Sequence, residues 1–421
     1  MPGISRPVCA LTSALVLSMT AWLTVAGAGS AEAAPVPQPT PKSSASPTSS
    51  PSPSHSAANA PVPAKTPKPV AIGPGQAPSQ STVPLPTPPP LQTSPAASFP
   101  QPTGDTPPPL TAPSSLLPPP KPVSVTPPSG KADDGSYIGS ETWLDPRMAD
   151  LKIGSMSVGA MVVARIIVPA GWSPTSNGET WPVLYLLHGG RDDYTSWTRN
   201  TDIESFVADK NVIVVMPENG PTGIPTRWWN GGKNKPDYES FDAVELMQLL
   251  ERDFNASSTR AAAGVSSGAY GAVMMAAHFP GTFAAAASYS GILNTTAPGM
   301  PAVMRALVVG QNIQADALWG DPLHNVQVWN QDNPYAQATG LRWTSVFLSC
   351  GDGMGPSDDP IGKVLERAIE PQNIAFAARL NTLGIPVQTA FYPGEVHNWG
   401  AWRIAFAASW PLLAASLGLP S

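Results

Sequence analysis

The chain has 421 residues, of which 53 are proline, and a formal net charge of −6 at pH 7. This slightly acidic balance, without a basic patch, argues against a nucleic acid as partner. Of the two cysteines, Cys9 lies in a segment that we expect to be removed and Cys350 remains alone, so no intramolecular disulfide is predicted.

Residues 1–33 have the pattern of a secretory signal peptide. Arg6 stands in a basic start, an apolar run follows from about residue 10 to 28, and Ala31-Glu32-Ala33 fits a cleavage site. Polar residues interrupt the run and small residues follow it, which favours cleavage over a retained membrane anchor. The sequence therefore predicts a protein that is secreted or held in the cell envelope, with no transmembrane anchor after cleavage.

Residues 34–130 are mainly Pro, Ser, Thr and Ala. A segment of this composition cannot bury enough apolar surface to offset its chain entropy, so we predict a disordered linker. It would serve as a spacer or a simple tether, and its Ser and Thr residues beside Pro are compatible with O-glycosylation.

Residues 131–421 form the predicted folded domain, in which apolar runs alternate with helical patterns. Strands are predicted at 162–168, 182–187, 212–216, 261–263, 284–288, 345–350 and 388–392, and helices at 242–254, 269–279, 363–383 and from about 400. This order indicates an α/β fold of the α/β-hydrolase type, with a mainly parallel central sheet and helices on both faces. The site of such a fold lies beyond the carboxyl ends of the strands.

The motif Gly264-Val265-Ser266-Ser267-Gly268 stands between a predicted strand and a predicted helix. This is the context of a nucleophile elbow, a turn so sharp that side chains two residues before and after the serine would clash. The helix that follows points its N-terminus, which favours negative charge, at the serine. We therefore predict Ser266 as the nucleophile, since an ordinary turn is the weaker interpretation of this context.

The motif Leu187-His188-Gly189-Gly190 ends the predicted strand at 182–187. In α/β-hydrolases this loop gives one backbone N–H to the oxyanion, and the residue after the nucleophile gives the other. Gly190 and Ser267 are therefore the predicted oxyanion donors, and His188 is predicted to be structural or to face the substrate.

A serine hydroxyl needs a base to take its proton. Among the five histidines, His397 follows the last predicted strand and precedes the last helix, which is where this fold places its base. Two carboxylates are candidates for the third member of the triad. Asp352 directly follows the strand at 345–350, and Glu366 lies in the helix at 363–383; spacing alone slightly favours Asp352. No metal or organic cofactor is needed for this chemistry.

The segment 185–197 resembles the Tyr-Leu-Leu-Asp-Gly-Leu-Arg, Asp-Asp-Tyr and Trp segment of the antigen 85 mycolyltransferases, which belong to the broader esterase D group. Trp-Gly-Asp-Pro at 319–322, Cys-Gly-Asp-Gly at 350–353 and His-Asn-Trp at 397–399 are similar to further motifs of that family. The resemblance covers essentially the whole of the predicted folded domain.

In that family the acid is a Glu in a helix, followed by an Asn-Ile segment, and Glu366 has this spacing. The resemblance therefore implies Glu366 as the acid, with Asp352 as its rival. It also implies that Arg191 and Trp399 border the substrate. The family's Asp that contacts a sugar acceptor is His188 here, and the Ser after its catalytic His is Asn398, which argues against trehalose as the acceptor.

The sequence is compatible with three functions. The leading hypothesis is a serine acyl-ester hydrolase or acyltransferase, with an acyl ester or glycolipid as substrate and an acyl pocket partly lined by tryptophans, for which Trp228, Trp229, Trp319 and Trp399 are the candidates. The second is a mycolyltransferase that uses trehalose or a cell-wall glycan. The third is a non-catalytic module that binds fibronectin or cell-wall sugar; such proteins usually lose the serine or the histidine, and this chain has both.

Overall fold

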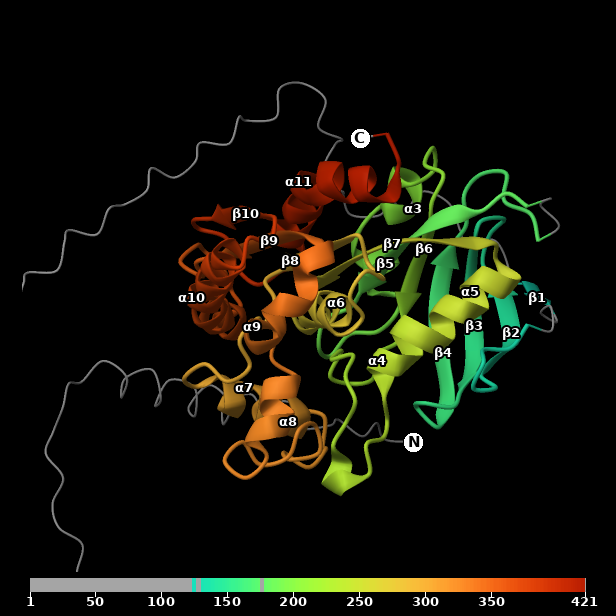
Figure 1. The fold of residues 1–421 in the computed structure, drawn as a ribbon. Helices are drawn as coiled ribbons and strands as arrows, with labels where there is room; N and C mark the ends of the chain where they lie inside the picture. Colours follow the sequence, from blue (N-terminus) through green and yellow to red (C-terminus); the bar gives the residue numbers. More distant parts are fainter. Residues whose placement is uncertain (1–122, 126–129, 175–177, 421) are drawn as a thin grey trace, which may run out of the picture. The chain divides into compact units, whose positions relative to one another are not determined.

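The computed structural model describes residues 123–125, 130–174 and 178–420, which fall in one compact unit of the chain. The predicted signal peptide (1–33) and nearly all of the predicted linker (34–130) lie outside the described residues. Figure 1 shows the described part as a sheet with helices packed on it.

Within the described residues, ten strands form one sheet in the order β1-β2-β3-β4-β6-β5-β7-β8-β9-β10. The strands are β1 (Val123–Val125), β2 (Tyr137–Trp143), β3 (Met148–Ser155), β4 (Ala160–Ile167), β5 (Trp181–Leu187), β6 (Ile213–Pro217), β7 (Ala256–Val265), β8 (Ala285–Tyr289), β9 (Ser345–Gly351) and β10 (Val387–Tyr392).

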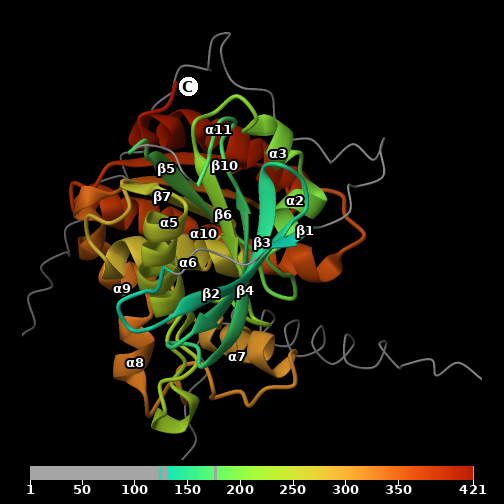
Figure 2. The same cartoon turned by 90° about the vertical axis from the view of Figure 1, so that its right-hand side faces the viewer.

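The sheet has an antiparallel part and a parallel part. The strands from β1 to β4 pair antiparallel, as do β4 and β6, whereas the run from β6 through β5, β7, β8 and β9 to β10 is parallel. Figure 2 shows β2, β3 and β4 extending from the rest of the sheet. The six parallel strands are those that the sequence predicts between helices, so the α/β fold class is confirmed.

Helices cover both faces of the parallel part. They are α2 (Ser196–Asn200), α3 (Ile203–Phe206), η1 (Asn230–Gly232), α4 (Tyr238–Ser240), η2 (Phe241–Leu246), α5 (Met247–Asp253), α6 (Ser267–His278), α7 (Met300–Val309), α8 (Val326–Gln331), α9 (Pro334–Gln337), η3 (Ala338–Trp343), α10 (Pro360–Thr382) and α11 (Trp399–Leu417).

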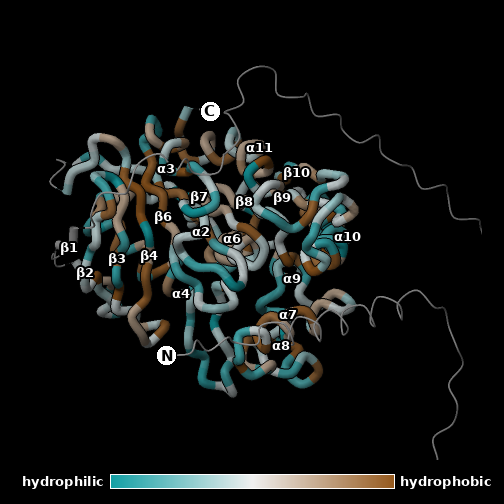
Figure 3. The backbone as a smooth tube through the Cα atoms, turned by 180° about the vertical axis from the view of Figure 1, so that it is seen from behind, coloured by the Kyte–Doolittle hydropathy of each residue, from teal (hydrophilic) through white to brown (hydrophobic). Residues whose placement is uncertain are grey.

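Strand β5 shows why both faces are apolar, because successive side chains of a strand point to opposite faces. Tyr185 packs in one core cluster with residues of α6 and α10, and Leu184 and Leu186 pack in another with residues of α2, α3 and α11. Figure 3 shows hydrophobic residues concentrated in strands such as β4 and β6. A third cluster joins residues of α7, α8 and α10.

The parallel strands all run in one direction, so their carboxyl ends meet at one edge of the sheet. β5 ends at Leu187, β7 at Val265, β8 at Tyr289, β9 at Gly351 and β10 at Tyr392. The loops that follow these ends carry the candidate site.

Candidate active site

The turn between β7 and α6 holds Ser266 in an unusual backbone conformation. Its φ is 55° and its ψ is −120°, in a region that side chains rarely occupy. A Cβ atom on Gly264 would lie 2.4 Å from the backbone carbon and oxygen of Gly268. Gly264 is therefore needed to close the elbow, which presents Ser266 at the carboxyl edge of the sheet. Gly268 is needed for a different contact, because its Cβ atom would lie 2.3 Å from the carbonyl oxygen of His188.

Three side chains from distant parts of the chain form a hydrogen-bond series at this edge. His397 Nε2 lies 2.9 Å from Ser266 Oγ, across 131 residues of sequence. His397 Nδ1 lies 2.6 Å from Glu366 Oε2. A carboxylate only accepts hydrogen bonds, so Nδ1–H donates to Glu366 and the lone pair of Nε2 faces the hydroxyl of Ser266.

Glu366 is held by more than His397. Its side chain is fully buried, and its Oε1 accepts hydrogen bonds from Ser290 Oγ and from the backbone N–H of Gly351, each at 2.7 Å. Trp402 Nε1 donates to Ser290 Oγ at 3.1 Å, and the Trp402 ring packs edge-on against the His397 ring at 5.0 Å. The carboxylate therefore has a fixed position, and the imidazole is confined by an indole.

Asp352, the alternative acid, has a different role in the structure. Its Oδ1 accepts hydrogen bonds from the backbone N–H groups of Met354 at 2.8 Å and Gly394 at 3.0 Å, and these bonds lower its pKa. These contacts tie together the loops after β9 and β10. The structure thus brings Glu366, and not Asp352, within hydrogen-bond distance of His397.

The two predicted oxyanion donors border the serine. Gly190 lines the same pocket as Ser266, and a Cβ atom on the preceding Gly189 would lie 3.3 Å from the Ser266 Cβ. Ser267 is the first residue of α6, where a backbone N–H has no acceptor within the helix. Both residues thus lie in backbone that borders Ser266.

His188, which was predicted to be structural or to face the substrate, does not line the pocket. Its side chain is 1% exposed, and both ring nitrogens are bonded to backbone groups, those of Gly189 and Asn219. Arg191 is also absent from the pocket lining, and its guanidinium lies next to Gly310 at the end of α7. Because the loop turns after β5, the His188 side chain points into the protein and the Arg191 side chain points outward.

Trp399 lines the pocket, as predicted, and stands edge-on to Trp197 at 5.2 Å and to Trp402 at 5.3 Å. The pocket has a volume of about 280 Å³. Its lining residues come from the loops after β5, β7 and β10 and from the start of α11: Gly189, Gly190, Asp192, Val265, Ser266, His397, Asn398, Trp399 and Trp402. Apolar rings thus form one wall, and the polar groups converge on Ser266.

Other tryptophans that the sequence places near an acyl pocket lie elsewhere. Trp228 and Trp319 are buried in the cluster that joins α7, α8 and α10, and Trp229 is not among the pocket residues. Cys350 belongs to the same cluster, is 2% exposed, and has a pKa raised by burial. Cys350 is therefore a core residue.

Sequence reasoning assigned no role at the site to three residues: Asp192, Ser290 and Trp402. Ser290 immediately follows β8. Its position at the carboxyl end of a parallel strand could have identified it as a site residue. Asp192 lines the pocket and is ion-paired with Arg199. Asn398 accepts a hydrogen bond from the backbone N–H of Ala401 at 3.1 Å and thereby caps α11.

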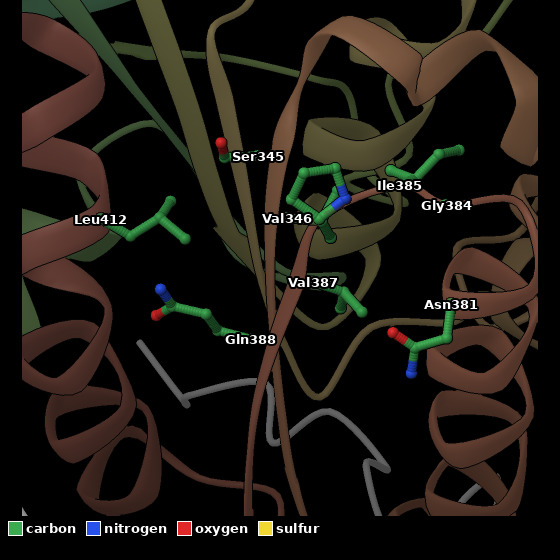
Figure 4. Close-up of a pocket in the computed structure, with 9 residues that line it drawn as sticks. Ser345, Val346, Asn381, Gly384, Ile385, Val387, Gln388 and Leu412 are labelled. Atoms are coloured by element: carbon green, nitrogen blue, oxygen red, sulfur yellow. The ribbon is translucent and has the colours of Figure 1, made fainter. Parts of the chain in front are cut away.

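A second pocket, of about 380 Å³, opens where β9 and β10 begin, away from the carboxyl edge. Figure 4 shows Asn381 and Gln388 pointing into it from α10 and β10, opposite Leu412 of α11.

Among the described residues, no group of three or more His, Cys, Asp and Glu side chains is placed to hold a metal ion. No helix in this part of the chain has the length and apolar character to cross a membrane.

The fold and the site at its carboxyl edge are those of the α/β-hydrolase class of esterases and acyltransferases. Residues 155–413 match the family model described as putative esterase, and the chain belongs to that family.

Two curated relatives illustrate its range. Esterase Rv1288 of Mycobacterium tuberculosis is 30% identical over 284 residues, which cover 63% of this chain and 59% of the relative. The chain thus spans about three fifths of the length of that relative. Diacylglycerol acyltransferase/mycolyltransferase Ag85B of Mycobacterium intracellulare is 29% identical over 266 residues, which cover 58% of this chain and 78% of the relative.

Solved structures show the same fold. The chain matches the crystal structure of Mycobacterium tuberculosis MPT51 (FbpC1) with a TM-score of 0.53 and 21% identity, over 63% of this chain and 97% of that protein. It matches FphF, a fluorophosphonate-binding serine hydrolase of Staphylococcus aureus, with a TM-score of 0.50 and 19% identity, over 63% and 97% of the two chains. The antigen 85-like character predicted from the motifs is therefore confirmed.

Proposed function

We propose that the protein is a secreted serine acyl-ester hydrolase or acyltransferase that works through an acyl-enzyme on Ser266. The observation that carries this proposal is the hydrogen-bond series from Ser266 through His397 to the buried carboxylate of Glu366. This arrangement supplies a nucleophile, a base and an orienting anion. Secretion rests on the signal-like pattern of residues 1–33.

In the first half-reaction, Ser266 Oγ attacks the acyl carbonyl carbon and its proton passes to His397 Nε2. The backbone N–H groups of Gly190 and Ser267 donate to the oxygen that becomes negative. Glu366 stabilises the imidazolium that forms. The tetrahedral intermediate then breaks its bond to the alkoxy oxygen, which takes the proton from Nε2 and leaves as an alcohol.

In the second half-reaction, water or a sugar hydroxyl gives its proton to His397 Nε2 and attacks the acyl-enzyme carbonyl. The bond to Ser266 Oγ breaks, and the proton returns to that oxygen. The product is a free acid when water attacks and a new ester when a sugar attacks. The roles of Gly190, Ser267, Glu366 and His397 are the same in both halves.

Hydrolysis of a chromogenic short-chain ester tests this function. Ser266→Ala removes the nucleophile, and we expect its kcat to fall by about 10⁴-fold or more, as when a triad member is lost. Ser288→Ala is the matched control, because Ser288 Oγ is buried in β8 without a hydrogen-bond partner among the described residues. Turnover of Ser266→Ala at the wild-type rate would overturn the proposal.

A second candidate function is the transfer of a mycolic acid to trehalose or a cell-wall glycan. The similarity to Ag85B, named a diacylglycerol acyltransferase/mycolyltransferase, favours it. His188 stands where antigen 85 proteins carry the Asp that contacts the sugar, and this favours water or another acceptor. Product analysis with and without trehalose separates the two, since only transfer gives a new glycolipid and acceleration by the sugar.

A third candidate is a non-catalytic module for a matrix protein or a cell-wall sugar. Covalent labelling by a fluorophosphonate probe separates it from both enzymes, because the probe reacts only with an activated serine. We expect labelling of the wild-type protein and none of Ser266→Ala.

A further inference from the structure

The loop after β5 contains a buried histidine that the proposed mechanism does not use. His188 is 1% exposed, and its ring lies between the backbone of its own loop and that of the loop after β6. Its Nδ1 is 2.8 Å from the carbonyl oxygen of Gly189, and its Nε2 is 3.0 Å from the backbone nitrogen of Asn219. A buried ring with two backbone partners is held in one orientation.

These partners determine which nitrogen carries the proton. The backbone N–H of Asn219 can only donate, so Nε2 must be the nitrogen with the lone pair. Nδ1 then carries the hydrogen and donates it to the Gly189 carbonyl. Glu218 Oε1 lies 3.8 Å from Nε2, but the Asn219 N–H occupies the position that an ion pair would need. His188 is therefore a neutral donor toward Gly189.

The acceptor of this hydrogen bond belongs to the peptide unit that contains the proposed oxyanion donor. The carbonyl of Gly189 and the N–H of Gly190 are parts of one planar, trans peptide, so they point in opposite directions. Fixing the carbonyl oxygen on one side thus fixes the direction of the N–H on the other. A glycine pair without such a contact turns easily, because neither residue has a side chain to restrict it.

The loop after β6 confines the same carbonyl from a second direction. A Cβ atom on Gly223 would lie 2.5 Å from Gly189 O, so the backbone at Gly223 passes directly against it. The same loop supplies the Asn219 N–H that orients His188. Two contacts thus hold one peptide unit next to Ser266.

We propose that His188 is a positioning residue that aims the Gly190 N–H at the oxyanion, by donating from Nδ1 to the carbonyl of the same peptide. The inference rests on the proposed function, because it gives His188 a role only in a reaction that forms an oxyanion. Of the two roles predicted for His188, structural or facing the substrate, it makes the structural one specific and indirect. Since the oxyanion exists only in the transition state and the intermediate, His188 affects kcat and leaves substrate binding unchanged.

A pair of amide variants separates the two hydrogen bonds of the ring. In His188→Asn the side-chain nitrogen takes the place of Nδ1 and still donates to Gly189. In His188→Gln the amide takes the place of Nε2, so it accepts from Asn219 but leaves Gly189 without its donor. A merely structural histidine would make both variants equally poor.

We expect His188→Asn to keep kcat within about threefold of wild type, and His188→Gln to lose about 10- to 100-fold in kcat, somewhat less than the loss of a whole oxyanion donor. KM for the chromogenic ester should change by less than about twofold in both. The affinity of a boronic acid, which mimics the tetrahedral intermediate, should fall in parallel with kcat. Thermal unfolding of both variants checks that they are folded.

A measurement on the wild-type enzyme needs no variant. Nitrogen NMR of the full chain with labelled histidine should show His188 as the neutral tautomer with the hydrogen on Nδ1; the other tautomer would overturn the proposal. Equal kcat for the two amide variants would overturn the positioning role alone. Absence of both ester turnover and fluorophosphonate labelling in the wild type would instead overturn the proposed function, and this inference with it.

Discussion

His397 Nδ1 lies 2.6 Å from Glu366 Oε2, although the rest of α10 and strand β10 separate the two residues in sequence. The contact brings the first half of α10 against the loop after β10. Glu366 is fully buried and also accepts from Ser290 and from Gly351. The three donors leave the carboxylate little freedom to turn, so the orientation of the imidazole is set before substrate arrives.

Glu366→Gln should therefore impair the base more than the fold. The oxygen of the new amide can still accept from Ser290 and Gly351, and its NH₂ group then faces His397 Nδ1. That NH₂ group forces the hydrogen onto Nε2, so the imidazole cannot take the proton of Ser266. We expect kcat to fall by about 10³- to 10⁴-fold, by analogy with an Asp-to-Asn change in a triad.

Ester turnover of Glu366→Gln and Asp352→Asn measures which carboxylate is the acid. Asp352 contacts backbone N–H groups of two loops, so its amide variant should keep activity within about threefold. The reverse order of the two variants would show that Asp352 is the acid.

Ser290 is predicted to support the triad without touching substrate. It donates to Glu366 and accepts from Trp402 Nε1, so Ser290→Ala leaves one buried donor unpaired and removes one bond from the carboxylate. We expect a loss of about 1–3 kcal/mol in the free energy of unfolding. We also expect a fall of about 10-fold or more in kcat, because small misplacements of catalytic groups are costly.

Ser288→Ala provides the control for this variant. Ser288 lies two residues earlier in the chain, is equally buried, and its Oγ has no hydrogen-bond partner in the described part of the chain. In urea unfolding and ester kinetics, Ser290→Ala should have a lower free energy of unfolding and a lower kcat than Ser288→Ala. Similar values for both would mean that the contact between Ser290 and Glu366 contributes nothing.

The sequence was sufficient to nominate Ser266 and His397, because both belong to patterns that are local in the chain. The elbow is a pentapeptide between a strand and a helix, and His397 stands between the last strand and the last helix. The acid was harder, since Glu366 reaches His397 from within a helix and spacing does not show which face of that helix is buried. The family resemblance, and not spacing, favoured Glu366.

Two features could not be derived from the sequence, for physical reasons. The sequence left open whether His188 is structural or faces the substrate, because its ring orientation depends on Asn219 in the loop after β6, which no local pattern reveals. Strands β1, β2 and β3 were not predicted, although in β3 Ala149, Leu151 and Ile153 alternate with exposed or half-buried residues. This alternation is the period of a strand with one buried face, whereas most of the predicted strands are continuous apolar runs.

Gly264→Ala should disrupt the elbow. The new methyl group would lie 2.4 Å from the carbon and the oxygen of the Gly268 backbone, and no flexible side chain can move to relieve this contact. We expect a loss of about 2–4 kcal/mol in the free energy of unfolding and a strong loss of activity. Gly139→Ala in β2 is the control, because its Cβ would meet its nearest neighbours at 3.4 Å, an ordinary contact. An equally stable and active Gly264→Ala variant would contradict the proposed role of the glycine.

A buried acid predicts how stability depends on pH. Burial raises the pKa of Asp332 to about 7, even though Thr226 Oγ1 donates to its Oδ1 at 2.5 Å. Between about pH 4 and 7, folded Asp332 keeps a proton that the unfolded chain releases, so the free energy of unfolding falls as the pH rises through this window. The slope from one such proton is at most about 1.4 kcal/mol per pH unit.

His278 extends the same trend to higher pH. Burial lowers its pKa, but the hydrogen bond from Nδ1 to Glu239 Oε1 at 2.8 Å, the bond to the Gln331 carbonyl and the charges of Glu239 and Asp332 together outweigh this effect and raise the pKa to about 9. Folded His278 thus holds a proton that the unfolded chain loses above about pH 6.5, and its contribution to stability is lost as the pH rises toward 9.

Urea unfolding at a series of pH values measures both windows. Asp332→Asn should flatten the curve between about pH 4 and 7, and His278→Gln should flatten it between about pH 6.5 and 9. If the wild-type protein became more stable across either window relative to the corresponding variant, the assigned direction of that pKa shift would be wrong.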